Sequence, residues 1–328
     1  MNGEMITVVV PAYNNAPWLP RSLDSLLAQT YPNLQIVVVN DGSTDDTAAV
    51  LDGYAAKYPR IKAIHKENGG VTSARLRGVR EADGDWIGFM DGDDVVDADM
   101  YAHLMKNARQ YAADISHCGH HVLFLDGRIS YVHNSGTLRQ QDMLTGVRDL
   151  LDGGLIESSL CTKLFRKELF AGLPEFMDPA ITINEDYLMN YYLFSRCQKA
   201  VFEDFCPYCY ILRQGSASYK VLHEHSIFDP IRVRKMILAD CVPELKQDAR
   251  IALLRNLLFS YAQLTMDMDK KYDEFRSRVR QLLAQEKAHF HLLSARNKIL
   301  ANMILKAPWT FHIAYPLFVK WIQREEQH

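Results

Sequence analysis

Residues 85–99 read Asp-Trp-Ile-Gly-Phe-Met-Asp-Gly-Asp-Asp-Val-Val-Asp-Ala-Asp, and this stretch decides the fold class of the chain. Its apolar run, Trp86–Met90, is typical of a short buried strand and ends abruptly in Asp91, Gly92, Asp93 and Asp94. In an open α/β sheet, ligands bind at the carboxyl ends of the strands. Because crowded carboxylates repel one another unless a cation lies between them, we expect a hard metal ion at this strand end.

Three earlier apolar runs indicate the strands that surround this one: Ile6–Pro11, Leu34–Val39 and Ile61–His65. Helical patterns separate them: leucines at helical spacing over 19–27, a capping-box spacing at Ser43–Asp46 that opens a helix to Lys57, and a helix over 71–81. Strands that alternate with helices predict a mostly parallel sheet with right-handed crossovers. We therefore expect the polar residues at the strand ends on one edge of the sheet: Tyr13, Asn14, Asp41 and Asp91–Asp94.

Length and composition narrow the class of protein. The 328 residues suffice for one large domain or two modest ones, and 48% of them are hydrophobic, as in ordinary globular proteins. The net charge of -3 gives no reason to expect a nucleic-acid partner. Six cysteines without paired metal spacing favour reduced thiols. With neither a signal-peptide pattern nor the roughly 20 apolar residues of a membrane span, we expect a cytoplasmic protein.

Beyond residue 113 the pattern is less regular. Two β-rich segments, Ile115–Leu125 and Arg128–His133, predict a hairpin around Asp126-Gly127. We further expect helices over 141–151 and 163–171, a helix opened by Glu185-Asp186, a strand over 199–204 and a polar loop over 208–218. Only helical patterns follow residue 220, which predicts an α/β domain over 1–220 and a helical region over 221–328.

An Asp-x-Asp pair at a strand end suits Mg²⁺ or Mn²⁺, because these ions take one or two carboxylates together with substrate phosphates. The alternative is an acidic turn that caps the helix near 99–110. An EF-hand is excluded, because Val95, Val96 and Ala102 stand where the calcium loop needs an oxygen ligand, a glycine and a glutamate. The absence of Walker A and G-x-G-x-x-G motifs argues against P-loop enzymes and dinucleotide oxidoreductases.

Four motifs follow the four expected strands in order: Pro11-Ala-Tyr-Asn14, Asn40-Asp-Gly-Ser-Thr-Asp45, Asn68-Gly-Gly with Ala74-Arg75, and Asp91-Gly-Asp-Asp94. This ordered set closely resembles the family 2 inverting glycosyltransferases over roughly residues 5–220. The resemblance implies the GT-A nucleotide-sugar fold, an α/β fold with a Rossmann-like, mostly parallel sheet flanked by helices. Here a C-terminal helical extension follows that fold.

The same resemblance implies a nucleotide-sugar site. Pro11, Ala12, Tyr13 and Asn14 would border the nucleotide, and Asp41 resembles the acid that hydrogen-bonds the base. The segment that approaches the ribose and diphosphate would contain Gly69, Gly70 and Arg75. The Asp-x-Asp motif would be Asp91, Gly92 and Asp93, with Asp93 and Asp91 holding Mn²⁺ or Mg²⁺.

Three later segments extend the resemblance. Asn184-Glu185-Asp186 resembles the motif whose aspartate is the catalytic base, so Asp186 is the expected base. Cys161-Thr-Lys-Leu-Phe-Arg166 resembles an Asn-Lys-Leu-Tyr-Arg-like segment with a departure at Cys161-Thr162, and its Lys163 and Arg166 either contact phosphate or are solvated. Tyr208-Cys-Tyr…Arg213…Ser216-Ala-Ser218 resembles a Tyr-x-Tyr-Arg…Ser loop, with Arg213 displaced from the usual place.

Together these motifs imply a metal-dependent, inverting glycosyltransferase of hexosyltransferase type. It would move a sugar from a UDP-sugar to a hydroxyl of a glycan or lipid-linked acceptor, in polysaccharide biosynthesis at the cell envelope. The Gln-x-x-Arg-Trp motif of processive synthases is absent, which favours the transfer of single sugars. Two alternatives stay open: a sugar-phosphate nucleotidyltransferase, which would need a Gly-rich phosphate loop after the first strand, and a catalytically silent nucleotide-binding or scaffold module.

Residues 296–324 differ from the rest of the chain, because they contain five basic residues and no acidic ones. Apolar and aromatic residues accompany these charges, while Lys306, Pro308 and Pro316 forbid a clean membrane span. A basic, aromatic, amphipathic segment suits an anionic membrane interface. The alternative is a helical cap that packs on the rest of the protein.

Overall fold

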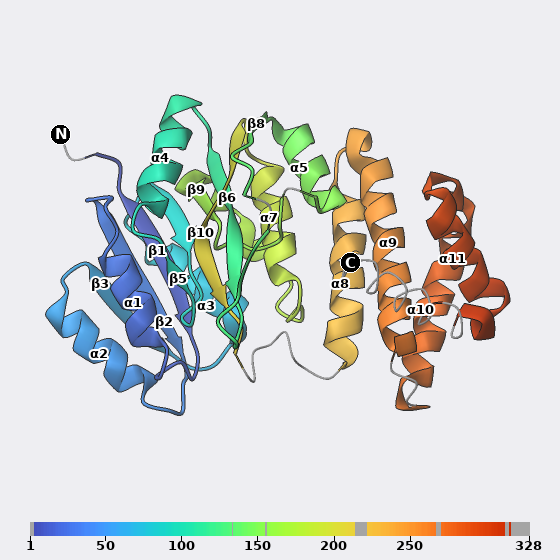
Figure 1. The fold of residues 1–328 in the computed structure, drawn as a ribbon, viewed down its shortest axis with the longest axis horizontal. Coiled ribbons are helices and arrows are strands. Elements are labelled where there is room, and N and C mark those ends of the chain that lie inside the picture. Colours follow the sequence, from blue (N-terminus) through green and yellow to red (C-terminus); the bar gives the residue numbers. More distant parts are fainter. Residues whose placement is uncertain are drawn as a thin grey trace. The chain divides into compact units, whose positions relative to one another are not determined.

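The computed structural model describes residues 3–132, 134–154, 156–213, 222–266, 270–311 and 315. By its internal contacts the chain divides into two compact units, Met1–Lys220 and Val221–His328. Figure 1 follows the helices and strands of both units along the sequence. Ser216 and Ser218, named above for a Tyr-x-Tyr-Arg…Ser loop, lie outside the described residues, as does most of 312–324.

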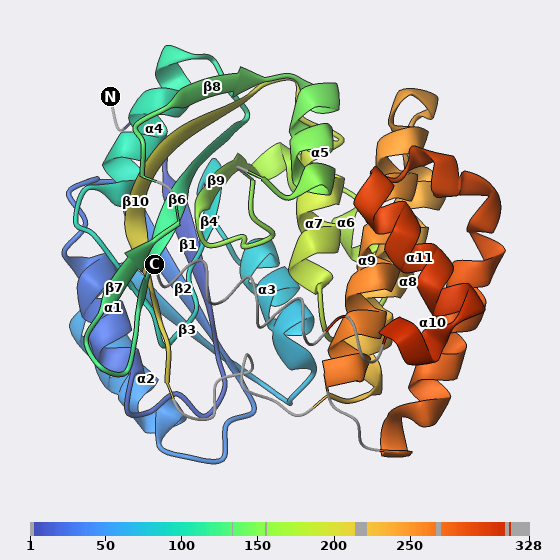
Figure 2. The ribbon, with the colours of Figure 1, turned by 45° about the vertical axis from the view of Figure 1, so that its right-hand side comes forward.

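The first unit begins with four parallel strands, as the sequence predicts: β1 (Ile6–Ala12), β2 (Leu34–Asp41), β3 (Ile61–Lys66) and β4 (Trp86–Phe89). The helices between them are α1 (Leu19–Leu27), α2 (Thr47–Lys57) and α3 (Gly70–Arg80). In Figure 2, α1 and α2 lie on one face of these strands and α3 lies on the other. Because both faces are covered, β1, β2 and β4 are mostly buried and rich in β-branched and aromatic residues, such as Val8, Val38 and Phe89.

The remaining strands make the sheet mixed. They are β5 (Val95–Val96), β6 (Ile115–Leu123), β7 (Ile129–Tyr131), β8 (Leu138–Gln141), β9 (Lys163–Arg166) and β10 (Ala200–Ile211). In the described residues the strand order is β3-β2-β1-β4-β9-β6-β10-β5, with β7 beside β6 and β8 beside β10. Strand β9 runs antiparallel to both β4 and β6, whereas β6 and β10 are parallel. The expected α/β fold is confirmed, and its parallel part is the half that carries the four motifs.

Four helices follow β5 in the first unit: α4 (Met100–Gln110), α5 (Met143–Asp152), the short α6 (Leu173–Phe176) and α7 (Glu185–Phe194). The predicted hairpin is confirmed, because β6 and β7 pair antiparallel around a turn in which Gly127 has φ 85°. The predicted helix opened by Glu185-Asp186 is confirmed as α7.

Two predictions of secondary structure beyond residue 113 are wrong. Residues 163–171 do not form a helix: Lys163–Arg166 are strand β9, and only a 3₁₀ turn follows at Lys167–Phe170. Leu164 and Phe165 are fully buried there, because they pair with β4 and β6. Tyr208–Ile211 are not loop but the end of β10, where Tyr208 and Cys209 pair with Val96 and Val95.

The capping box predicted at Ser43–Asp46 is also wrong. Helix α2 begins at Thr47, and the residue before it makes no side-chain cap. Instead, the Ser43 hydroxyl accepts a hydrogen bond from the Asn14 N–H at 3.0 Å. Ser43 and Thr44 therefore bind the loop after β1, while Asp45 Oδ1 accepts the Thr47 N–H at the start of α2 at 3.0 Å.

The second unit is helical in its described residues, with α8 (Glu224–Asp240), α9 (Lys246–Met266), α10 (Asp273–Gln285) and α11 (Ala295–Lys306). Short 3₁₀ turns accompany them at Pro243–Leu245, Lys270–Tyr272 and Lys287–Leu292. All four helices contribute to one apolar core, for example through Ile227, Leu254, Val279 and Ile304. Among the residues described, no helix is both long and apolar enough to cross a membrane.

Candidate active site

The acidic turn after β4 lies against the end of β1. A Cβ added at Gly92 would lie 3.2 Å from the Pro11 carbonyl oxygen and 3.4 Å from Asn15 Nδ2, so a larger residue would be crowded here. The turn closes through the Asp94 N–H, which donates to the Asp91 carbonyl at 3.2 Å. Glycine therefore allows the Asp-Gly-Asp-Asp turn to approach the strand end that carries Pro11 and Ala12.

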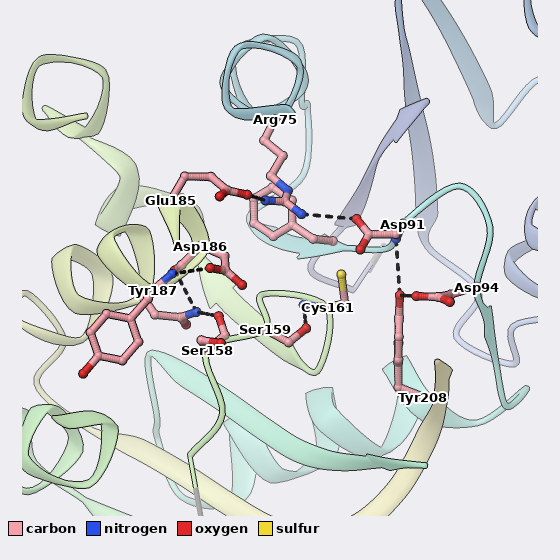
Figure 3. A network of polar contacts seen from close by, with 12 residues as sticks. Arg75, Asp91, Asp94, Ser158, Ser159, Cys161, Glu185, Asp186, Tyr187 and Tyr208 are labelled. Atoms are coloured by element: carbon pink, nitrogen blue, oxygen red, sulfur yellow. Dashed lines mark hydrogen bonds and ion pairs between the residues drawn. The ribbon is translucent and has the colours of Figure 1, made fainter. Parts of the chain in front are cut away.

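Arg75 links this turn to α7. Its Nη1 donates to Glu185 Oε1 at 2.9 Å, and its Nη2 donates to Asp91 Oδ1 at 3.2 Å. Figure 3 shows the guanidinium between the two carboxylates. The Arg75 side chain is buried, and the neighbouring charges of Asp91 and Glu185 raise its pKa against the opposing effect of burial. Residues 110 positions apart in the sequence thereby belong to one site.

Asp186 follows Glu185 at the start of α7 and adjoins this cluster (Figure 3). Burial and then the Glu185 charge raise the pKa of Asp186 to about 7, while Arg75 lowers it. Its Oδ1 accepts the Tyr187 N–H at 2.7 Å. A carboxylate with a pKa near neutrality is suited to accept a proton, because it is both ionised and basic at working pH.

Asp94 closes the acidic turn through its N–H and also links this turn to β10. Its carboxylate is buried and accepts hydrogen bonds from the Tyr208 hydroxyl at 2.6 Å and the Ile211 N–H at 2.9 Å. The Tyr208 hydroxyl in turn accepts the Asp91 N–H at 3.3 Å (Figure 3). Asp94 and Tyr208 therefore fix the acidic turn to β10. Burial and the charges of Asp91 and Asp93 raise the pKa of Asp94 well above its ordinary value.

Asp93 pairs with Arg213, whose role the sequence left in doubt. Arg213 Nε donates to Asp93 Oδ2 at 2.7 Å, and the guanidinium carbon lies 4.0 Å from the centroid of the Trp18 ring. Burial and the charge of Asp91 raise the pKa of Asp93, against the opposing effect of Arg213. Trp18 thus serves as a surface on which this guanidinium stacks.

Asp41 lies at the end of β2, buried, and its Oδ1 accepts the Gly69 N–H at 3.0 Å and pairs with the Lys66 ammonium. Gly69 and Gly70 line a cleft of about 530 Å³ that runs along α3. The structure therefore brings Asp41 to the glycines predicted beside it. That these residues bind the nucleotide stays a prediction.

The β1 end presents Tyr13 and Asn14 differently. Tyr13 is half exposed, as a side chain that borders a ligand would be. Asn14 has φ 52°, and its Oδ1 accepts the Thr44 N–H at 2.8 Å. The Asn14 side chain thus holds the β2 loop, and the Tyr13 ring is the more available surface.

The expectation that Lys163 is solvated is wrong. Its ammonium is buried and donates to the carbonyl oxygens of Glu157 and Ser159. That it contacts phosphate stays a prediction. Burial lowers its pKa to about 8. Arg166 stacks over the Trp86 ring at 4.6 Å and pairs with Glu4 and Asp114, which is also a structural role.

The acidic turn supplies only two carboxylates for a divalent cation, which is fewer oxygen ligands than such an ion needs. Asp91 and Asp93 offer hard oxygen ligands on one turn, where Arg75 contacts Oδ1 of Asp91 and Arg213 contacts Oδ2 of Asp93. Among the described residues, no group of three His, Cys, Asp or Glu side chains could hold a metal. Two carboxylates would need further oxygens from a ligand, which is how Mg²⁺ sites that bind substrate phosphates are built.

The sheet flanked by helices, with the acidic turn at its strand edge, has the architecture of GT-A glycosyltransferases. Residues 7–173 match the sequence model described as glycosyl transferase family 2. The chain belongs to this family.

Curated relatives are also named as glycosyltransferases, and a solved structure has a similar fold. The chain is 33% identical over 210 residues to "Uncharacterized glycosyltransferase EpsJ" of Bacillus subtilis, and 30% identical over 266 residues to "Glycosyltransferase GlyA" of Streptococcus pneumoniae. These alignments cover 63% and 78% of this chain, but only 60% and 37% of the relatives. The crystal structure of S. aureus TarS 1–349 in complex with UDP-GlcNAc has a TM-score of 0.68 at 18% identity, covering 95% of this chain and 88% of that chain.

Proposed function

We propose that this chain is a metal-dependent, inverting, non-processive glycosyltransferase. It moves a sugar from a UDP-sugar to a hydroxyl of a glycan or glycolipid acceptor. The observation that supports it most is the Arg75 bridge, because it joins the acidic turn at Asp91 to the helix start that carries Asp186. The residues that we propose for the leaving diphosphate and for the proton are thus linked through one arginine.

We propose the type of sugar donor from the residues at the ends of β1 and β2. The Asp41 carboxylate, with Oδ1 engaged by Lys66 and Gly69, keeps Oδ2 for an N–H of the base. The half-exposed Tyr13 ring offers an apolar face to the nucleotide. UDP is favoured because TarS, which has a similar fold, was solved with UDP and with UDP-GlcNAc.

The proposed reaction is a single displacement. Asp186 accepts the proton of the acceptor hydroxyl as its oxygen bonds to the anomeric carbon, while the bond from that carbon to the diphosphate oxygen breaks. Attack on the face opposite the leaving group inverts the anomeric centre. Mn²⁺ or Mg²⁺ held by Asp91 and Asp93 would neutralise the charge that grows on the diphosphate.

The exchange of Asp186 for asparagine tests the base. Asp186→Asn should lower the transfer rate by about 10²–10⁴-fold, because it removes proton transfer in the transition state. Donor binding, measured by thermal shift with UDP and Mn²⁺, should persist. Unchanged transfer would place the base elsewhere, and the absence of a thermal shift with any nucleotide in the wild type would favour a silent scaffold.

A further inference from the structure

Helix α11 and the turn after it present two apolar faces. One face is part of the core of the second unit, where Ala301, Ile304 and Phe311 are fully buried. On the other, Ile299 is 61% exposed, and Trp309, just past the helix, is 67% exposed. A surface helix normally needs only one apolar face, the one that turns to its core.

The outer side of the helix is partly apolar. Ile299, Met303 and Lys306 are spaced i, i+4 and i+7, which places them on one side, although Met303 is half-buried and also packs on the core. Together with Lys298, Asn302 and Ala307 they line an open groove of about 420 Å³. We call this groove, with Trp309, the α11 face.

The charges around the α11 face have one sign. Lys298 and Lys306 line the groove, and neither has an acidic partner within the described part of the chain. Arg280 lies nearby, because its Nη2 donates to the Leu305 carbonyl at 2.7 Å. Residues 287–324 contain no aspartate or glutamate at all. An occupant should therefore be apolar where it meets Ile299 and Trp309 and negatively charged around them.

We infer that the α11 face binds the surface of an anionic lipid bilayer, with the helix lying in the headgroup plane. Aromatic and aliphatic side chains enter the acyl boundary of such a surface while lysines meet the lipid phosphates. Trp309 is well suited to this depth, because an indole ring is apolar with one polar N–H. This binding is independent of the proposed glycosyl transfer.

Vesicle sedimentation of the whole chain tests the inference. We expect it to pellet with vesicles of phosphatidylglycerol mixed with phosphatidylcholine, and to stay in solution with phosphatidylcholine alone. Added salt should release it, because surface charges are screened within about 3 Å at 1 M ionic strength. Equal pelleting with both vesicles, or none with either, would overturn the inference.

Point variants are preferable to removal of the segment, since deletion would also take Ala301, Ile304 and Phe311 out of the core. Lys298→Glu with Lys306→Glu should weaken vesicle binding at least about 25-fold, because each lysine contributes about fivefold near an anionic surface. Trp309→Ala should weaken it on the order of tenfold. The matched controls are Lys57→Glu with Lys235→Glu, and Phe259→Ala, all at exposed positions that are not part of the α11 face.

The controls should bind like the wild type, with circular dichroism showing that every variant is folded. If the controls lose as much binding as the α11 variants, the face is not the site. A second copy of the chain is the competing occupant. Light scattering that shows a dimer abolished by Trp309→Ala, without lipid, would overturn the bilayer as the occupant of the face.

Discussion

Two arginines pair with the same acidic turn, but their surroundings differ. Arg75 comes from α3, its side chain is 7% exposed, and it holds the buried Glu185 as well as Asp91. Arg213 follows β10, its side chain is 23% exposed, and within the described part of the chain it pairs with Asp93 while it stacks on Trp18. We expect loss of the buried arginine to leave a buried carboxylate unpaired, and we expect the partly exposed one to be exchangeable for another cation.

The largest expected effect is on stability. Arg75→Met should lower the free energy of unfolding by about 3–5 kcal/mol, because it leaves the Glu185 carboxylate buried without its partner. Arg213→Met is the matched variant and should cost no more than about 1 kcal/mol, as for partly exposed ion pairs. Urea unfolding followed by tryptophan fluorescence measures both. Similar losses in the two variants would show that the arginines do not differ in this way.

The second expected effect is on the pH dependence of kcat/KM, to which Glu185, the partner of Arg75, should contribute and Arg213 should not. Asp186 is a base only when ionised, so kcat/KM should rise with pH and level off above an inflection near 7, the pKa that burial and Glu185 give it. Glu185→Gln removes the charge that raises this pKa and keeps an oxygen for Arg75, so the inflection should move down. Arg213→Met should leave it in place, since the charges acting most on Asp186 are Glu185, Arg75 and Asp91.

The pH profile also has outcomes that would contradict this assignment. An inflection that stays in place in Glu185→Gln would mean that another group titrates. One that moves in Arg213→Met would mean that Arg213 acts on the base as strongly as its neighbours do. Profiles recorded at saturating metal separate these effects from any change in metal binding.

The sequence predicts the half of the sheet that carries the motifs, and the structure shows why. The β-branched runs of β1 and β2 are local signals, because strands covered on both faces are apolar throughout. Once these strands are parallel, their ends must meet on one edge, which explains how Pro11 and Gly92 come together.

The partners of the acidic turn could not be predicted in the same way. Lys163–Arg166 and Tyr208–Ile211 become strands through pairing with β4, β6 and β5, and no local periodicity encodes those neighbours. Likewise, the ion pairs of Arg75 with Glu185 and of Arg213 with Asp93 span 110 and 120 residues. From sequence, Arg213 is only a motif residue displaced from its usual position. Its stacking on Trp18 requires the end of β10 to lie beside the residues before α1, which no local pattern predicts.

The smallest expected effect concerns the metal itself. If Arg213 is the exchangeable cation of Asp93, Arg213→Met should bind Mn²⁺ more tightly than the wild type in the absence of nucleotide. An ion pair of this exposure contributes up to about 1 kcal/mol, which corresponds to about fivefold in affinity. Isothermal titration calorimetry with Mn²⁺ alone measures this affinity without any turnover.

Two control variants accompany this measurement. Asp93→Ala should abolish Mn²⁺ binding, and Arg80→Met, a change at an exposed arginine of α3, should leave it unaltered. Weaker Mn²⁺ binding in Arg213→Met would mean that Arg213 orients Asp93 for the metal and does not compete with it. The two arginines would then both be fixed parts of the site, and the contrast between them would hold for stability alone.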